Sequence, residues 1–257
     1  MIDLTLIGIG TGHPDHVTVE AIKAMNIADL ILIPLKGEDK ADLAGLRQEI
    51  CRSFVTNPAT RIASFDLPVR NPATPDYLTR VNDWHDEIAA VWAASIRANL
   101  TAGTGHVAFL VWGDPSLYDS TLRIAERLAR HMPLRLNVIP GITAIQALCA
   151  AHAVPLNDLA APVIITTGRQ LRAKGWHEGA ETMVVMLDSG GAFGSLDPEG
   201  INIWWGAYVG MPNQVLLSGP LASTAEDIRA LRANARADHG WIMDIYLMRR
   251  AVGQGAH

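Results

Sequence analysis

Apolar residues in the first half of the chain recur in short runs, and each run leads through a glycine- or proline-containing loop into a helical pattern. The first run, Ile2 to Ile7, predicts a buried strand that feeds Gly8, Gly10 and Gly12. Prolines between residues 54 and 75 predict an irregular loop. Strands that alternate with helices indicate a largely parallel sheet. Further strands are predicted at residues 30–33, 107–111 and 135–139, and helices near residue 18, within 36–52, and at 77–100, 120–128 and 142–152.

The pattern changes after Pro155, where strands follow one another more often than they alternate with helices. This favours a mixed sheet. The sequence therefore predicts an α/β protein of two domains, at residues 1–120 with a mostly parallel sheet and at 121–250 with a mixed sheet, followed by a flexible tail at 251–257. In the second half, strands are predicted at residues 163–167, 183–187, 201–205 and 241–248, a hairpin around 210–213 and a helix at 224–234.

Composition narrows the class of protein. A hydrophobic content of 49% with 18% charged residues is typical of a folded enzyme rather than a disordered chain. The net charge of -5 argues against nucleic acid as the main partner, because phosphate contacts need a basic surface. Cys51 and Cys149 lie far apart, so neither a disulfide framework nor a metal site is expected. The N-terminus has no basic leader and the apolar runs are too short to span a bilayer, which predicts a cytoplasmic protein without membrane contact.

The first candidate motif is the segment GIGTGHPDHVT at residues 8–18. Glycines after a strand let the backbone turn sharply and let a ligand approach the main chain. A dinucleotide-binding fingerprint would need its third glycine one place later, and Pro14 has no amide to offer a phosphate. These departures disfavour nicotinamide or flavin binding, while a purely structural turn stays open.

Two further motifs also follow predicted strands. In WGDPSLYDS, Gly113 allows close approach and Asp114 supplies acceptor oxygens at a strand end, where open α/β sheets bind ligands. The alternative is an Asp-Pro turn in which Asp119 or Ser120 caps the next helix. In VIPGITAIQAL, Thr143 and nearby amides begin a helix and form a polar cradle, although an ordinary strand-to-helix turn has the same sequence.

The order and spacing of the three motifs together resemble the tetrapyrrole (corrin/porphyrin) methylases. That family shows GxGxGxxxxLT at the first strand, GDPxxY or GDPxxF later, and PGIT or PGIS about thirty residues further on; this chain has GIGTGHPDHVT, GDPSLY and PGITA in register. It departs from many members at Thr11, where they have proline, at His13, where they have aspartate, and at Trp112, where several have glycine.

The resemblance implies a two-domain fold with a ligand trough between the domains, S-adenosylmethionine as methyl donor, a tetrapyrrole rich in carboxylates as substrate, and a homodimer. By motif position it also implies the residues that bind the cofactor. These are Thr11, Trp112, Gly113, Asp114, Leu117, Thr143, Ala144, Met186, Leu187, Trp204 and Met243.

Within the family, the segments WGDPSLYDSTLRI, VIPGITAIQAL, ITTGRQL and WWGAYVGMPNQVLLSG are most similar to the cobalamin-pathway members that methylate carbon 1 of precorrin-5 and release a two-carbon acyl group as acetate. Acyl loss requires water and a proton-transfer residue, for which Tyr118 is preferred over His13, Asp15 and His16. Gly10, His13, Asp15 and Arg169 are expected to bind substrate. Arg169, beside Arg172, is the preferred carboxylate anchor, whereas Arg123, Arg127 and Arg130 recur at helical spacing and indicate a solvated helix face.

Other functions remain open at this stage. The same fold could methylate another corrin carbon, a diphthine precursor or a ribosomal RNA cytidine, although the acidic balance disfavours RNA. A non-catalytic tetrapyrrole carrier and a nicotinamide oxidoreductase are the alternatives from other classes.

Overall fold

The computed structural model describes residues 1–35, 41–70, 73 and 76–250. The chain forms two compact units that divide between Thr143 and Ala144. The predicted α/β architecture, with a parallel first sheet and a mixed second sheet, is confirmed. Among the described residues, no helix combines the length and apolar character that a bilayer crossing requires. The predicted tail at 251–257 lies outside the described residues.

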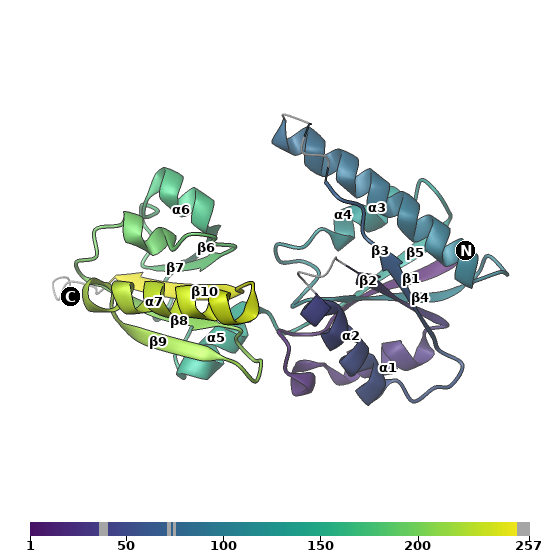
Figure 1. Cartoon of the computed structure of the whole chain (residues 1–257), viewed down its shortest axis with the longest axis horizontal. Helices are drawn as coiled ribbons and strands as arrows, with labels where there is room; N and C mark the ends of the chain where they lie inside the picture. Colours follow the sequence, from purple (N-terminus) through teal and green to yellow (C-terminus); the bar gives the residue numbers. More distant parts are fainter. Residues whose placement is uncertain (36–40, 71–72, 74–75, 251–257) are drawn as a thin grey trace. The chain divides into compact units, whose positions relative to one another are not determined.

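The first unit is a five-stranded parallel sheet in the order β3-β2-β4-β1-β5, with helices on both faces (Figure 1). Leu4 and Leu6 of β1 pack in the core layer that includes α3 and α4, and Ile7 packs in the layer with α1. Burial of both faces explains the uninterrupted apolar runs in the sequence. The strands are β1 (Ile2–Gly8), β2 (Leu30–Leu35), β3 (Arg61–Asp66), β4 (Gly105–Val111) and β5 (Leu134–Ile139). The helices are α1 (Val19–Ile27), α2 (Ala41–Phe54), α3 (Tyr77–Asn99) and α4 (Thr121–Leu128), with the 3-10 helix η1 at Pro14–His16.

Two differences from the sequence-based prediction have physical causes. Strand β3 lies within the segment predicted to be irregular, because it is an edge strand in which only Phe65 is buried, so its apolar signal is weak. The predicted boundary between residues 120 and 121 also differs from the observed division, because β5 pairs with β1 along Ile2 to Ile7 and thereby brings residues 121–143 into the first unit.

The second unit is a five-stranded sheet in the order β6-β7-β10-β8-β9, in which only β6 and β7 are parallel. Trp205, Phe193 and Tyr246 are fully buried in its core. The short helix α6, which was not predicted, begins where the Thr167 hydroxyl accepts the Gln170 N–H. The strands are β6 (Val163–Thr167), β7 (Thr182–Met186), β8 (Ile201–Ala207), β9 (Val215–Pro220) and β10 (Asp244–Arg250). The helices are α5 (Ala144–His152), α6 (Gly168–Lys174) and α7 (Leu221–His239), with η3 at Ala192–Ser195.

Candidate functional site

Three loops meet through their backbones at the carboxyl edge of the first sheet. Gly10 and Gly113 exchange two hydrogen bonds, at 3.3 and 2.8 Å between nitrogen and oxygen. A Cβ on Gly141 would overlap the Gly113 carbonyl oxygen and the Gly8 backbone. Gly8 and Gly141 therefore leave no room for a Cβ at this close approach, and the structure brings the three motifs together at the carboxyl ends of parallel strands.

Asp114 joins two of these loops. One carboxylate oxygen accepts the Ser116 N–H at 2.8 Å and the Ser116 hydroxyl at 2.5 Å, and the other accepts the Gly141 N–H at 2.8 Å. Burial alone would raise the pKa of Asp114, but these hydrogen bonds outweigh it and lower the pKa below its ordinary value. Asp114 is thus ionised at neutral pH and fixes the loop that carries Trp112, Gly113 and Leu117.

The loop of the first motif is held by contacts between its own residues. Thr11 is buried, with its hydroxyl 3.4 Å from His16 Nδ1. His13 Nδ1 accepts the Asp15 N–H at 3.2 Å and caps the 3-10 helix η1. Burial, followed by the nearby His13, lowers the pKa of His16. His13 and Asp15 keep much of their side-chain surface exposed, so both remain available to a ligand.

Tyr118 stands at the end of the loop that begins with Trp112. Its backbone φ is +49°, in the left-handed region, and the residue is 45% exposed. Burial of part of the side chain raises the pKa of its hydroxyl above the ordinary value of 10, so the phenol carries its proton at neutral pH.

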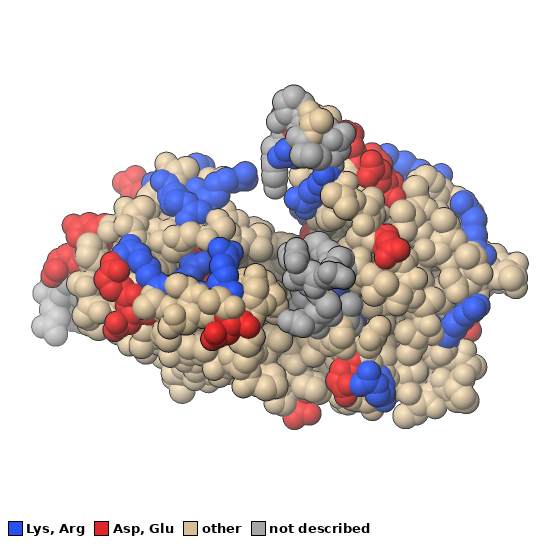
Figure 2. Space-filling view, viewed as in Figure 1, with Lys and Arg blue, Asp and Glu red and all other residues tan. Residues whose placement is uncertain are grey.

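Predicted residues of the second unit gather at one edge of its sheet. Strand β6 runs parallel to β7, with Thr167 opposite Met186, so Arg169 at the start of α6 follows the same edge as Leu187. Since β10 is antiparallel to β7, Met243, which precedes β10, lies at this edge too. Trp204 pairs with Leu247 and sits further along the sheet. Figure 2 shows Lys and Arg side chains gathered over α6.

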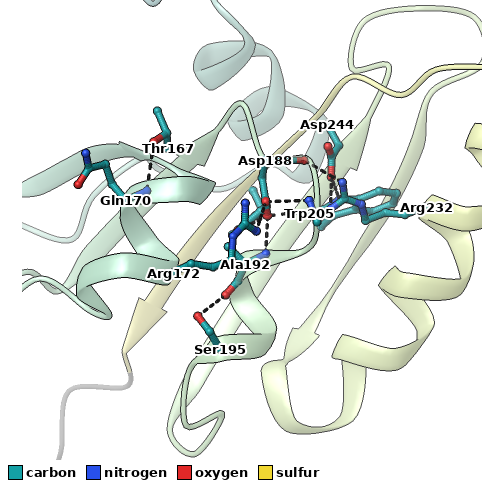
Figure 3. Close-up of polar contacts among 11 residues, drawn as sticks. Thr167, Gln170, Arg172, Asp188, Ala192, Ser195, Trp205, Arg232 and Asp244 are labelled. Atoms are coloured by element: carbon teal, nitrogen blue, oxygen red, sulfur yellow. Dashed lines mark hydrogen bonds and ion pairs between the residues drawn. The ribbon is translucent and has the colours of Figure 1, made fainter. Parts of the chain in front are cut away.

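Leu187 is 66% exposed with φ +52°, and a buried network holds the chain directly after it. The Asp188 carboxylate accepts the N–H groups of Gly190 and Ala192, at 3.1 and 2.5 Å, and the Arg172 guanidinium and Tyr246 hydroxyl, both at 2.8 Å. Figure 3 shows Arg172 and Ala192 converging on Asp188. Arg172, predicted beside Arg169 as a substrate cation, is therefore engaged in this network.

Arg232 extends the network from α7. Its guanidinium donates to the Asp188 carbonyl oxygen at 2.8 Å and lies 3.3 Å from an Asp244 carboxylate oxygen, which also accepts the Trp205 indole N–H at 2.8 Å (Figure 3). Burial raises the pKa of Asp244. For Asp188, burial would raise the pKa, but the hydrogen bonds from Ala192, Gly190, Tyr246 and Arg172 together lower it.

Sequence reasoning missed this network, whose only local signal is an aspartate after a strand, because the side chains that contact Asp188 come from residues 16 to 58 positions away. Of the three arginines interpreted as a solvated helix face, Arg123 and Arg130 are exposed, but Arg127 is not. Arg127 is mostly buried, pairs with Asp86 of α3 at 3.0 Å and donates to Asn82 at 2.7 Å, so it ties α4 to α3.

Comparisons with known proteins identify the relatives of this chain. The sequence profile of the tetrapyrrole (corrin/porphyrin) methylases matches residues 3–225. A precorrin-6A synthase [deacetylating] of Sinorhizobium sp is 47% identical over 255 residues, which cover 98% of this chain and 97% of that protein. A precorrin-2 C(20)-methyltransferase of the same source is 32% identical over 59% of each chain.

Solved structures also resemble this chain. A cobalamin-synthesis-related protein, CobF, from Corynebacterium diphtheriae has a TM-score of 0.83 and 38% identity, with 97% of this chain and 99% of that chain covered. A uroporphyrin-III C-methyltransferase from Thermus thermophilus, solved with S-adenosylhomocysteine, shares the fold with a TM-score of 0.59 and 16% identity over 96% of this chain and 92% of that one. The predicted family is confirmed: this chain belongs to the tetrapyrrole (corrin/porphyrin) methylases.

Proposed function

We propose that this protein is an S-adenosylmethionine-dependent methyltransferase that methylates carbon 1 of precorrin-5 and releases a two-carbon acyl group as acetate, in aerobic cobalamin biosynthesis. The observation that carries the proposal is the near end-to-end similarity to a deacetylating precorrin-6A synthase. Because the match leaves almost no part of either chain uncovered, the loops that surround the chemistry have counterparts in both proteins.

The carboxyl edge of the first sheet fits a ligand held by main-chain groups. Gly113 has φ +64°, and a Cβ placed there would meet only the Thr143 Cα, at 4.0 Å, so a ligand can approach the backbone. Asp114 keeps this loop in one conformation. Thr11, Trp112, Leu117 and Thr143 are the proposed partners from this unit, and Ala144, Met186, Leu187, Trp204 and Met243 those from the second.

S-adenosylmethionine, when bound, supplies a methyl group on a sulfonium that is a good leaving group. The residues of the chain then need only orient the nucleophilic ring carbon and exclude water, and positioning of this kind can provide much of the rate enhancement. The hydrogen bonds around Gly113 and Asp188 suit that task, because they hold the backbone of each loop in place.

Release of acetate needs a separate proton step. The bond between the ring and the acyl carbon breaks, the acyl carbon gains hydroxyl from water, and the macrocycle gains a proton. Tyr118 is the proposed proton donor, because its phenol is protonated at neutral pH and partly exposed.

Arg169 is the proposed anchor for a substrate carboxylate, with Gly10, His13 and Asp15 as further substrate contacts. The Arg169→Ala variant should raise the KM for the tetrapyrrole about tenfold, as expected for loss of a charge-assisted hydrogen bond, and leave S-adenosylhomocysteine affinity unchanged. An unchanged KM would remove Arg169 from the substrate site.

Mass spectrometry of purified protein with S-adenosylmethionine and precorrin-5 tests the proposal. A gained methyl group with acetate released is expected. A gained methyl group without acetate would replace the proposal by methylation of a different corrin carbon. Failure to bind S-adenosylhomocysteine would favour a non-catalytic tetrapyrrole carrier, and binding of NADH would favour an oxidoreductase.

We also propose that the enzyme is a cytoplasmic homodimer. The support is the family resemblance for the dimer and the pathway of the relatives for the compartment. Light scattering coupled to size-exclusion chromatography should give twice the chain mass of 27.7 kDa.

A further inference from the structure

The helix α6 carries positive charge in a chain that is negative overall. Arg169, Arg172 and Lys174 lie in the stretch from residue 163 to residue 177, which contains no aspartate or glutamate, whereas the whole chain has a net charge of -5. Lys and Arg side chains cluster over α6 in Figure 2. A ligand with several carboxylates would therefore meet favourable local charge at this helix.

Arg172 differs from an ordinary surface arginine, because the protein fixes one of its nitrogens. Its Nη1 donates to Asp188 Oδ1 at 2.8 Å, and the Asp188 side chain is only 1% exposed (Figure 3). The N–H groups of Gly190 and Ala192 hold that carboxylate in turn. The position of the Arg172 guanidinium is therefore set before any ligand binds, which reduces the side-chain entropy lost on binding.

The rest of this guanidinium is available at the surface. The Arg172 side chain is 39% exposed, and among the described residues its Nε and Nη2 have no hydrogen-bond partner. Gly190 is also exposed, and a Cβ built on it would lie 3.3 Å from Arg172 Nη1 and 3.9 Å from Cζ. The planar fork of N–H donors on an arginine matches the geometry of a carboxylate, so the remaining donors suit this acceptor.

Arg169 starts from a second fixed point on the same carboxylate. A Cβ on Gly168, the first residue of α6, would overlap the Asp188 side chain, so the beginning of the helix packs directly against it. Arg169 follows Gly168 in the chain, and Leu187, a proposed cofactor residue, directly precedes Asp188. Both arginines are thus attached to the fold around Asp188, beside the proposed cofactor contact of this unit.

We propose that Arg172 is a second anchor for a carboxylate of the substrate: Asp188 holds one guanidinium nitrogen, and the exposed donors bind the ligand alongside Arg169. The identification of this ligand as a tetrapyrrole rests on the proposed function. The carboxylate in the methionine part of S-adenosylmethionine has the same chemistry and is the other source. The tetrapyrrole is favoured, because a cluster of cations suits a ligand with several carboxylates better than a ligand with one.

Uroporphyrin I, a stable tetrapyrrole with carboxylates on all its side chains, tests binding without turnover by fluorescence titration. Arg172→Gln should weaken its binding about tenfold, as expected for loss of a charge-assisted hydrogen bond. Lys174→Gln is the matched control, since it removes the same charge from an exposed position of α6 and should weaken binding less than about twofold. Equal effects of the two variants, or no binding of uroporphyrin I to the wild-type protein, would overturn the proposal.

A second variant separates ligand binding from folding. Arg172→Lys keeps a positive charge beside Asp188 but lacks the planar fork of donors, so it should melt near the wild-type temperature and still bind uroporphyrin I several-fold more weakly. Wild-type affinity in Arg172→Lys, or affinities that only follow the melting temperatures of the variants, would show that Arg172 acts on the fold and not on the ligand.

Calorimetric titration with S-adenosylhomocysteine distinguishes the two sources of the carboxylate. Its affinity should be the same in Arg172→Gln and in the wild-type protein. Weaker binding of S-adenosylhomocysteine with unchanged binding of uroporphyrin I would assign Arg172 to the cofactor and overturn the proposal.

Turnover separates this proposal from the proposed function. With precorrin-5, Arg172→Gln should raise the KM about tenfold and change kcat far less, because the lost contact binds the substrate and not the reacting carbon. Methylation with an unchanged KM would remove Arg172 from the substrate site and leave the proposed function standing. Binding of uroporphyrin I that depends on Arg172, in a protein that does not methylate precorrin-5, would refute the proposed function and leave the carboxylate anchor standing.

Discussion

The edges of the two sheets that carry the predicted site residues are held together in different ways. At the first edge, glycine backbones touch directly, and Asp114 adds hydrogen bonds to Ser116 and Gly141. At the second edge, one buried carboxylate, Asp188, gathers backbone N–H groups, a hydroxyl and two arginines. A loop that packs through glycine backbones has no room for a Cβ at the contact. A loop held by a buried carboxylate is instead destabilised when that charge is removed.

The most damaging change should be Gly141→Ala, because its Cβ would overlap the Gly113 carbonyl and force the loops apart. We expect a loss of about 3 kcal/mol in the free energy of unfolding and a large loss of S-adenosylhomocysteine affinity. Urea denaturation and calorimetric titration measure the two. Gly45→Ala on α2 is the control, since a Cβ there meets nothing within 4 Å and should be neutral or slightly stabilising. Equal behaviour of the two variants would contradict the backbone contact.

Asp188→Asn tests the second edge. The amide removes the charge that faces Arg172 and Arg232 and points an N–H₂ group at existing donors, so we expect a loss of about 2–3 kcal/mol in urea denaturation. Asp227→Asn, on the exposed side of α7, is the matched control and should change stability by less than about 0.5 kcal/mol. A loss no greater than that of the control would show that the edge does not depend on this carboxylate.

The difference between the edges also explains what the sequence could predict. Apolar runs and the glycines after them are local signals, so the strands of the first sheet other than β3, and the three loops that follow strands, could be predicted from residues close together in the chain. Asp188 could not, because Arg172, Arg232 and Tyr246 come from separate elements that only folding brings together. A cavity lined by Trp84, Trp92 and Phe109 could not be predicted for the same reason, because α2, α3, α4 and three strands contribute to it.

Asp114→Asn should have a smaller effect than Asp188→Asn, because no cation among the described residues shifts the pKa of Asp114 and its Ser116 contacts are local. An asparagine oxygen can still accept one of the two backbone N–H groups, so we expect a loss of about 1 kcal/mol in urea denaturation and a few-fold weaker binding of S-adenosylhomocysteine. Asp66→Asn at the exposed end of β3 is the control for removal of one negative charge. A loss as large as that of Asp188→Asn would contradict the contrast between a backbone-built and a charge-built edge.

The smallest effect should be the pH dependence of stability. The first unit buries a neutral histidine, whereas the second buries a charged aspartate, so the two units lose stability in different pH ranges. Burial, with Arg127 and other nearby arginines, lowers the pKa of His85 from 6.5, and both ring nitrogens lack partners among the described residues. The unfolded chain therefore binds the extra proton more readily, so this site loses stability as the pH falls below 6.5. His85→Leu should reduce that loss by less than about 1 kcal/mol in urea denaturation between pH 7.5 and 5.5, whereas the exposed His131→Leu should not change it. Because the lowered pKa of Asp188 places its own loss of stability below pH 3.8, an unchanged slope in His85→Leu would mean that another group titrates in this range.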